Sequence, residues 1–220
     1  MSAEPPLGLV LDCDGVLVDS EGLASRVEAE VLRDLGVQLT VDEAHAMFLG
    51  KTVAGVLEAV EKRTGTTPTP GFTYNWAFAT AHAFMRELQP VPYLRAALEE
   101  LRRRGHPMAV ASQSPLARVR MSLEVAGLTG FFADRVCVTS MVARPKPAPD
   151  VYLLAAQRLQ LEPSACVVVE DSPAGAAAAS AAGMRAILYT PGPASAPAGA
   201  GNVRLMHSMD ELPGLIAALR

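Results

Sequence analysis

The sequence predicts an α/β protein: a doubly wound parallel sheet with an inserted α-helical subdomain. Three observations lead to this fold class. Short apolar runs of strand length recur along the chain, stretches with helical periodicity separate most of them, and one interval is far too long for a single connection. The chain has 220 residues, which is enough for one large domain or for a domain with a smaller insert.

Six apolar runs are the candidate strands. They are continuous rather than alternating, which is typical of parallel strands covered on both faces. We expect strands at 7–12, 107–112, 135–140, 166–171, 185–190 and, from a weaker pattern, 202–205.

Amphipathic stretches lie between most of these runs. We expect helices at 92–104, 115–126, 148–159, 173–182 and roughly 209–219. The stretch 173–182 is rich in alanine, with Pro173 where a helix begins and Gly183 after its end. Its small side chains favour close packing of helix on sheet. Strand alternating with helix predicts the doubly wound parallel sheet.

The long interval between the first two strands reads mostly as helix. Residues 20–35, 41–48, 52–63 and 71–88 form three or four amphipathic stretches. We therefore expect a core of 1–18 and 90–220 and a helical cap of 19–89, mobile over the end of the first strand. The aromatic residues of the last stretch are expected to form the core of the cap: Trp76, with Phe72, Tyr74, Phe78 and Phe84.

Composition and charge exclude several classes of protein. The formal net charge is −4 with no basic block, which argues against a nucleic-acid partner. No apolar run is long enough for a membrane span, and the N-terminus lacks a secretory pattern. We expect a cytoplasmic protein whose three cysteines are buried and reduced. The oligomeric state is left open, with a monomer favoured, and the role of the Pro- and Ala-rich surface loop expected at 190–201 is not readable.

Polar side chains follow the strands at their carboxyl ends, where an open parallel sheet binds its ligands. The first strand ends in Asp12 and Asp14, which point to the same side, and Gly15 lets the chain turn after them. The other ends supply Ser112 and Gln113, then Glu170 and Asp171, while Lys146 lies on a loop before a helix. Carboxylates at this density need a counter-charge, and an all-oxygen set suits Mg²⁺, which would attract a phosphate.

Four stretches resemble the motifs of the haloacid dehalogenase superfamily, in its Mg²⁺-dependent phosphatase branch with an inserted helical cap. They are DCDGVLVDS (12–20), ASQS (111–114), RPKPAPD (144–150) and VVVEDSPAG (167–175), in the order of the family. The resemblance implies a Rossmann-like core and a phosphoenzyme formed on Asp12. It also implies that Asp14 serves as general acid and then as general base.

The remaining roles come from the same resemblance. Ser112, Gln113 and Lys146 would hold the phosphoryl group. The Mg²⁺ ligands would be Asp12, Asp14 through its backbone carbonyl, Asp171, and Glu170 directly or through water. The expected function is hydrolysis of a small sugar phosphate such as 6-phosphogluconate, and Lys51 in the loop 47–56 could reach the substrate.

Two other functions remain open. A β-phosphoglucomutase-like transferase would have a histidine ten residues after the general acid and a cap lysine or arginine before Gly50, where this chain has Ala24 and Leu49. A binding or regulatory protein without activity would have lost Asp12, Asp14, Lys146 or Asp171, and all four are present.

Overall fold

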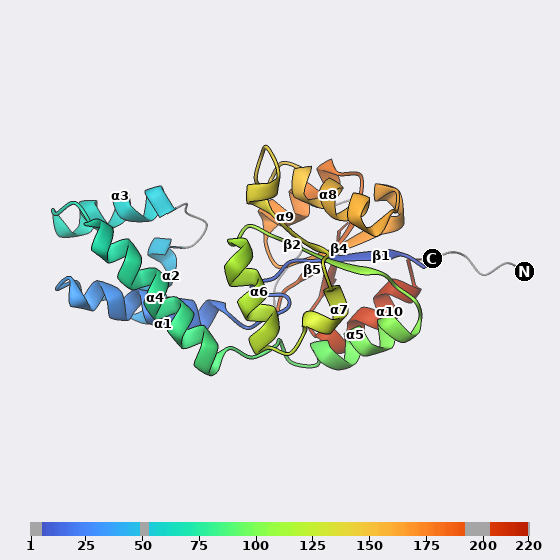
Figure 1. Ribbon diagram of the computed structural model, residues 1–220, viewed down its shortest axis with the longest axis horizontal. Helices are drawn as coiled ribbons and strands as arrows, with labels where there is room; N and C mark the ends of the chain where they lie inside the picture. The colour runs from blue at the N-terminus through green and yellow to red at the C-terminus, as the bar shows by residue number, and fades with distance from the viewer. Residues whose placement is uncertain (1–5, 49–52, 192–202, 220) are drawn as a thin grey trace, which may run out of the picture. The chain divides into compact units, whose positions relative to one another are not determined.

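The computed structural model describes residues 6–48, 53–191 and 203–219. The chain divides into two compact units: Met1–Val18 with Gln89–Arg220, here called the core unit, and Asp19–Leu88, here called the helical unit (Figure 1). Lys51 and most of the 190–201 loop, for which the sequence suggested roles, lie outside the described residues. Within the described ranges, no helix has both the length and the apolar character needed to cross a bilayer.

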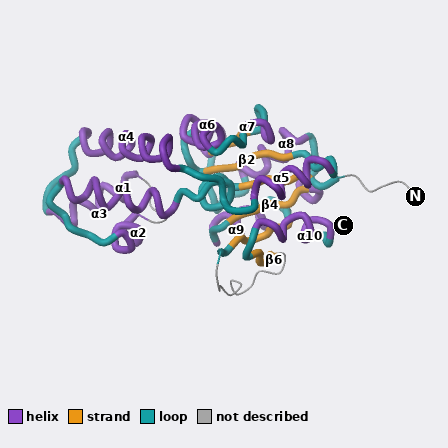
Figure 2. The backbone as a smooth tube through the Cα atoms, turned by 90° about the horizontal axis from the view of Figure 1, so that it is seen from below, coloured by secondary structure: helices purple, strands orange, loops and turns teal. Residues whose placement is uncertain are grey.

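The core unit contains a parallel sheet, which confirms the predicted fold class. Among the described residues six strands form it, in the order β3-β2-β1-β4-β5-β6. Figure 2 shows three of them, β2, β4 and β6, in this sequence across the sheet. Every predicted run contains a strand, with bounds that agree to within two residues at each end. The bounds are β1 Gly8–Leu11, β2 Met108–Ser112, β3 Val136–Val138, β4 Cys166–Glu170, β5 Arg185–Tyr189 and β6 Val203–Met206.

Both faces of the sheet are covered, as the continuous apolar runs predicted. Every residue of β1, β2, β3 and β4 is buried. Figure 1 shows α8 and α9 on one face of the sheet and α5, α7 and α10 on the other. The helices of this unit are α5 Leu94–Arg103, α6 Leu116–Val125, α7 Thr129–Phe132, α8 Asp150–Leu159, α9 Pro173–Ala181 and α10 Leu212–Ala217.

Two helical segments differ from the expectation. The helix α7 was not predicted, because four residues are too few to show a helical period. The last predicted helix is a 3-10 turn at Met209–Glu211 followed by α10, and Ser208 and Glu211 form a capping box at its start.

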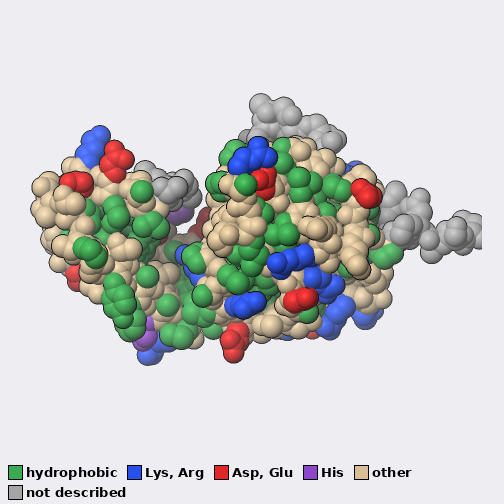
Figure 3. Space-filling model, turned by 45° about the horizontal axis from the view of Figure 1, so that its top comes forward, with side chains coloured by type: hydrophobic (Ala, Val, Ile, Leu, Met, Phe, Trp, Pro, Cys, Tyr) green, Lys and Arg blue, Asp and Glu red, His purple; other side chains and the backbone are tan. Residues whose placement is uncertain are grey.

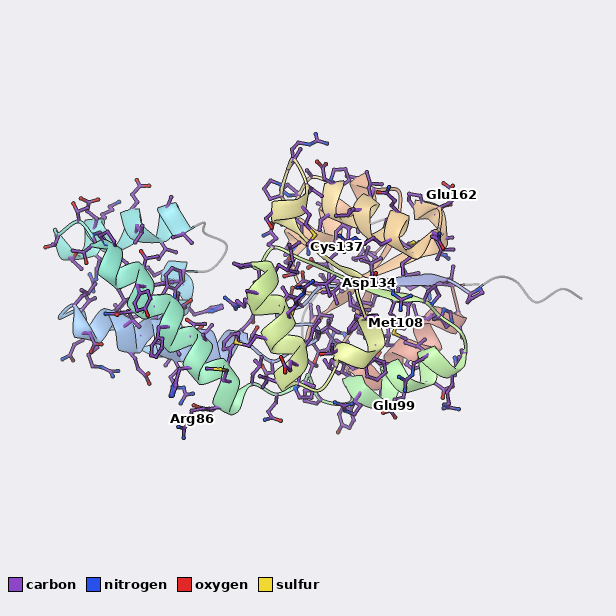
Figure 4. The ribbon with its side chains drawn as sticks, in the orientation of Figure 1. Arg86, Glu99, Met108, Asp134, Cys137 and Glu162 are labelled. Carbon is purple, nitrogen blue, oxygen red and sulfur yellow. The ribbon has the colours of Figure 1, made fainter. Side chains whose placement is uncertain are left out.

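The alanines of α9 pack as the sequence predicted. Ala176, Ala178 and Ala179 are buried, and the last two join a core cluster that also contains Val168 of β4 and Ala186 of β5. The three cysteines are also buried and unpaired, one of them Cys137 of β3 (Figure 4). Small side chains bring the start of α9 close to the end of β4.

The strand order places a topological switch point between β1 and β4. From β1 the chain proceeds outward through β2 and β3, then returns to add β4, β5 and β6 on the other side of β1. Connections diverge on either side of such a point and leave a crevice at the carboxyl ends of the strands. The backbone N–H of Asp12 donates to the carbonyl of Val169 at 3.0 Å, so the two strand ends stay joined up to the crevice.

The described residues of the helical unit form four helices, α1 Glu21–Asp34, α2 Val41–Phe48, α3 Val53–Thr64 and α4 Pro70–Glu87. They surround their own apolar cluster, which includes Leu32, Val60 and Phe72. Trp76 packs against this cluster, with its ring 5.0 Å from that of Phe48 in an edge-on arrangement. The predicted core role of Trp76 is therefore confirmed.

Two aromatic residues of α4 are not in this core, so that part of the expectation was wrong. The side chains of Tyr74 and Phe78 are 69% and 62% exposed, and hydrophobic side chains are visible on the surface of the helical unit in Figure 3. With 3.6 residues per turn, Phe72 and Trp76 share one face of the helix and Tyr74 and Phe78 another. The tyrosine and phenylalanine rings stack on each other with centroids 6.3 Å apart.

Candidate active site

The strand ends bring most of the predicted residues to one edge of the core unit. Asp12 directly follows β1, Ser112 ends β2 and Glu170 ends β4. Lys146, from the loop before α8, is distant in sequence from all three but is buried among them.

Lys146 is the centre of a buried ionic network. Its Nζ donates to Asp12 Oδ1 at 2.6 Å, to Glu170 Oε1 at 2.5 Å and to the carbonyl oxygen of Ala111 at 3.0 Å. All three N–H donors of the ammonium group therefore have acceptors. The ring of Tyr152 lies beside the same group, with its centroid 4.9 Å from Nζ.

The carboxylate of Glu170 is the most enclosed charge of the site, with 1% of the residue exposed. The hydroxyl of Tyr152 donates to Oε1 at 2.7 Å, beside the Lys146 bond. Oε2 accepts from the backbone N–H groups of Asp171 and Ser172, both at 3.0 Å, and from Ser172 Oγ at 2.8 Å. Both oxygens are thus engaged by the protein itself, and this carboxylate fixes both Lys146 and the turn that carries Asp171.

The environments of Asp12 and Glu170 drive their pKa values in opposite directions. Burial raises the pKa of Asp12 to about 7, partly offset by Lys146 and reinforced by the charge of Glu170. Burial acts in the same sense on Glu170, but Lys146, Tyr152 and Ser172 outweigh it and lower its pKa. Burial opposes the charge of Lys146, yet the two carboxylates prevail and raise its pKa. Glu170 is therefore the better stabilised anion. The positive charge of Lys146 does not fully offset the effect of burial on the charged form of Asp12.

Asp14 lies beyond the buried network and is held by the segment that follows β2. Ser114 Oγ donates to Asp14 Oδ2 at 2.6 Å, and Arg118 Nη2 donates to Oδ1 at 3.0 Å. The Asp14 side chain is 27% exposed, so it reaches solvent while Asp12 is nearly enclosed. The two aspartates therefore occupy distinct environments although one residue separates them.

Gly15 brings Asp171 against the end of β1. The φ of Gly15 is +77°, and a Cβ built on it would lie 1.9 Å from Asp171 Oδ2. Only glycine accommodates both the backbone conformation and the approach of the carboxylate. The predicted proximity of Asp171 to the first motif follows from this packing.

The two residues predicted to hold phosphate after β2 differ in position. Ser112 is buried, and its Oγ accepts the backbone N–H of Ser114 at 3.0 Å, which leaves its O–H available as a donor. Gln113 is exposed, and its backbone carbonyl accepts from Thr139 Oγ1 at 3.3 Å.

Sequence reasoning did not identify Tyr152, Ser114, Arg118 or Ser172 as parts of the site. Each lies within six residues of a predicted site residue, at the start of the helix that follows it. That position was the available signal, since the first turn of a helix after a strand end faces the same crevice.

The donor set fits a divalent cation. Four carboxylates, those of Asp12, Asp14, Glu170 and Asp171, lie at the strand ends with two cations, Lys146 and Arg118, so acidic groups outnumber the cations in this set. Among the described residues, no group of three His, Cys, Asp or Glu side chains is placed to hold a metal. Asp12 and Asp171, together with a backbone carbonyl and water, would supply an oxygen set of the kind Mg²⁺ prefers.

Comparison with known proteins agrees with this architecture. The family model for haloacid dehalogenase-like hydrolases matches residues 7–183. The chain belongs to the haloacid dehalogenase-like hydrolase family, in the group that includes sugar-phosphate phosphatases and β-phosphoglucomutase-like proteins.

Individual relatives match most of the chain. Fructose-1-phosphate phosphatase YqaB of Escherichia coli is 32% identical over 180 residues, which cover 82% of this chain and 94% of that protein. The 6-phosphogluconate phosphatase of Escherichia coli is 27% identical over 205 residues, 93% of this chain and 91% of that protein. The chain also matches 17% of a much longer plant protein, SUPPRESSOR OF QUENCHING 1 of Arabidopsis thaliana, at 32% identity.

A solved structure has the same fold over nearly the full chain. It is a HAD family hydrolase from Deinococcus radiodurans R1 with bound phosphate and sodium, 34% identical, with a TM-score of 0.81. The match covers 98% of this chain and 96% of that one.

Proposed function

We propose that the chain is a Mg²⁺-dependent phosphomonoester hydrolase that acts on a small sugar phosphate through an aspartyl-phosphate. One observation carries the proposal: two carboxylates lie at one strand end, and Asp12 is buried against Lys146 while Asp14 is more exposed and held by other residues. Two titratable groups in distinct environments are what a nucleophile and a separate acid–base group require.

In this proposal an oxygen of Asp12 attacks phosphorus, and the ester P–O bond breaks. Asp14 gives its proton to the departing oxygen, so the sugar leaves as an alcohol. Water then attacks the phosphorus of the phosphoenzyme, Asp14 takes the proton of that water, and the bond to Asp12 breaks to release phosphate. Lys146 keeps Asp12 Oδ1 in position and supplies positive charge beside the transferring group. The hydroxyl of Ser112 would donate to a phosphate oxygen.

Mg²⁺ is proposed as the cofactor, held by Asp12, the backbone carbonyl of Asp14 and Asp171. When bound, it would neutralise charge on the phosphoryl group and on the carboxylates that surround it. Both oxygens of Glu170 accept hydrogen bonds from protein donors. We therefore propose that Glu170 contacts the metal through water, or that it orients the turn that carries Asp171. Removal of Mg²⁺ with EDTA is expected to stop turnover, and Ca²⁺ is expected to inhibit because its shell is larger and looser.

The substrate class rests on the relatives. Fructose-1-phosphate phosphatase and 6-phosphogluconate phosphatase are named for phosphorylated sugars or sugar acids. Transfer of the phosphoryl group back to a sugar is less favoured, since Ala24 replaces the histidine of the mutase pattern.

The test is phosphate release from fructose 1-phosphate, 6-phosphogluconate, phosphoglycolate and nucleotides, with and without Mg²⁺. Asp12→Asn should abolish turnover without unfolding the protein. Asp134→Asn is the matched control, because Asp134 is exposed and lies before the amino end of β3, whereas the site lies at the carboxyl ends of the strands (Figure 4). Isomerisation of a hexose 1-phosphate without net phosphate release would instead support the mutase. A folded wild-type protein inactive in both assays would favour a binding role.

A further inference from the structure

The carboxyl group of Asp14 is contacted by two residues to which the sequence analysis gave no role: Ser114, the last residue of the motif 111–114, and Arg118, which lies outside the motifs. Arg118, in the first turn of α6, donates from Nη2 to Oδ1, and Ser114, in the turn before that helix, donates from Oγ to Oδ2. The Arg118 side chain is 33% exposed, so this ion pair lies at the mouth of the crevice rather than in its floor.

The two contacts are chemically different. A guanidinium group donates hydrogen bonds and accepts none, whereas a hydroxyl group can do either. Oδ1 of Asp14 must therefore remain an acceptor as long as Arg118 stays in place. A proton on this carboxyl can be accommodated on Oδ2, where the hydroxyl of Ser114 rotates and accepts instead of donating.

We propose that Arg118 is a positioning residue for Asp14: together with Ser114 it fixes the plane of the carboxyl group and directs the transferable proton to Oδ2. This inference rests on the proposed function, in which the same carboxyl group protonates the leaving oxygen in the first step and accepts a proton from water in the second. A planar guanidinium group suits this task because its N–H groups point in fixed directions, so the single Nη2 donor fixes Oδ1 in direction as well as in distance.

The support for this arrangement comes from the fold. The backbone N–H of Ser114 donates to Ser112 Oγ, so the residue that contacts Oδ2 is fixed to the end of β2. Arg118 extends from α6, a helix of ten residues that begins directly after that turn. The proposed acid–base group after β1 is therefore held by the segment that follows β2, through contacts distinct from those of Lys146 with Asp12.

The test compares a poor and a good leaving group. Phosphoenzyme formation from an alkyl phosphate needs a proton on the departing oxygen, whereas p-nitrophenolate leaves without one. In Arg118→Met we expect kcat/KM for the faster of fructose 1-phosphate and 6-phosphogluconate to fall by about 10- to 100-fold, within the range of general acid catalysis. For p-nitrophenyl phosphate kcat/KM should fall by less than about threefold.

The second step gives an independent readout. If Asp14 is misaligned as a base, hydrolysis of the phosphoenzyme becomes slow, and p-nitrophenyl phosphate should show a burst of nitrophenol equal to the enzyme concentration. Arg118→Lys keeps the charge but not the planar guanidinium group, and it should show the same preference for the good leaving group with a smaller loss. Arg120→Met is the control, since Arg120 is an exposed arginine on the same helix.

Three results with the variant would overturn the inference, and a fourth, with the wild-type protein, would overturn the proposed function as well. An equal loss for both substrates would make Arg118 a structural residue, and a higher KM at unchanged kcat would make it a binding group for the substrate anion. Kinetics of Arg118→Met equal to those of wild type would show that Asp14 needs no such support. If the wild-type protein with Mg²⁺ turned over neither substrate, the proposed function itself would fail, and the inference with it.

Discussion

Gly175 is a position where a single methyl group should damage the site. This glycine lies in the first turn of α9, with its Cα against the carboxylate of Glu170. A Cβ built there would lie 1.9 Å from both Cδ and Oε1 of Glu170 and 2.3 Å from Oε2. The carboxylate cannot move away from the new methyl group without breaking hydrogen bonds, because Lys146, Tyr152 and Ser172 all donate to it.

The expected effect of Gly175→Ala is a loss of stability of about 1–5 kcal/mol. Overpacking of a buried position costs about 1–3 kcal/mol, and displaced hydrogen bonds to a buried charge add about 1–3 kcal/mol. The better helix propensity of alanine returns about 1 kcal/mol. Gly214→Ala in α10 provides the matched control, since nothing lies within 4 Å of a Cβ built at that position. It should be neutral or stabilising by up to about 1 kcal/mol.

Urea unfolding followed by circular dichroism measures both variants at constant m-value. Gly175→Ala should have the lower midpoint and should also lose phosphatase activity, because Lys146 and the turn of Asp171 depend on Glu170. A Gly175→Ala variant as stable as Gly214→Ala would refute the reasoning. It would mean that the carboxylate of Glu170 can move without cost and that the buried network is not rigid.

Two further predictions concern the same network. Burial raises the pKa of Asp12 to about 7, against 3.8 for the ordinary carboxyl group, so between these values the folded state holds a proton that the unfolded state has lost. This contribution is present at low pH and lost as the pH rises through 7, so the metal-free protein should lose about 2–3 kcal/mol of stability between about pH 5 and 8. Urea titrations across this range should show the loss in wild type and not in Asp12→Asn, and equal slopes would contradict the assignment. Tyr152→Phe removes the hydroxyl that donates to Glu170 and should lower the free energy of unfolding by about 1–2 kcal/mol. Tyr93→Phe, at an exposed tyrosine, should be neutral. Equal urea midpoints for the two variants would contradict the role of Tyr152.

Much of the fold was predictable because its signals are local. Continuous apolar runs predicted the strands, and alanines predicted the close packing of α9 on the sheet. Helical periodicity predicted the four helices of the helical unit, but it did not predict which aromatic side chains of α4 would be buried. Phe78 is as apolar as Phe72, yet Phe78 is exposed and Phe72 is buried, because the neighbouring helices pack on only one face of α4.

The residues of the site also divide into those predicted from local sequence signals and those that only the packing of elements brings together. The sequence determined that Asp12, Asp14, Glu170 and Asp171 stand at strand ends, because a parallel sheet brings its carboxyl ends to one edge. The tertiary structure alone decided how these like charges are stabilised. Lys146 was assigned to phosphate, yet its Nζ also bridges Asp12 and Glu170, and each of those contacts joins residues remote in sequence.

The support of Asp14 illustrates what sequence could not determine. Arg118 is one of several arginines in amphipathic helices, and its spacing from Ser112 does not distinguish it from Arg120 on the same helix. The rotation of α6 decides which of the two reaches the crevice: Arg118 donates to Asp14, and Arg120 is exposed. Chemical identity at a strand end is local information, whereas the partner of a charge depends on packing between elements. For that reason the sequence by itself determined the fold class and the acidic residues of the site, and only the tertiary structure decided which cations and hydroxyl groups hold them.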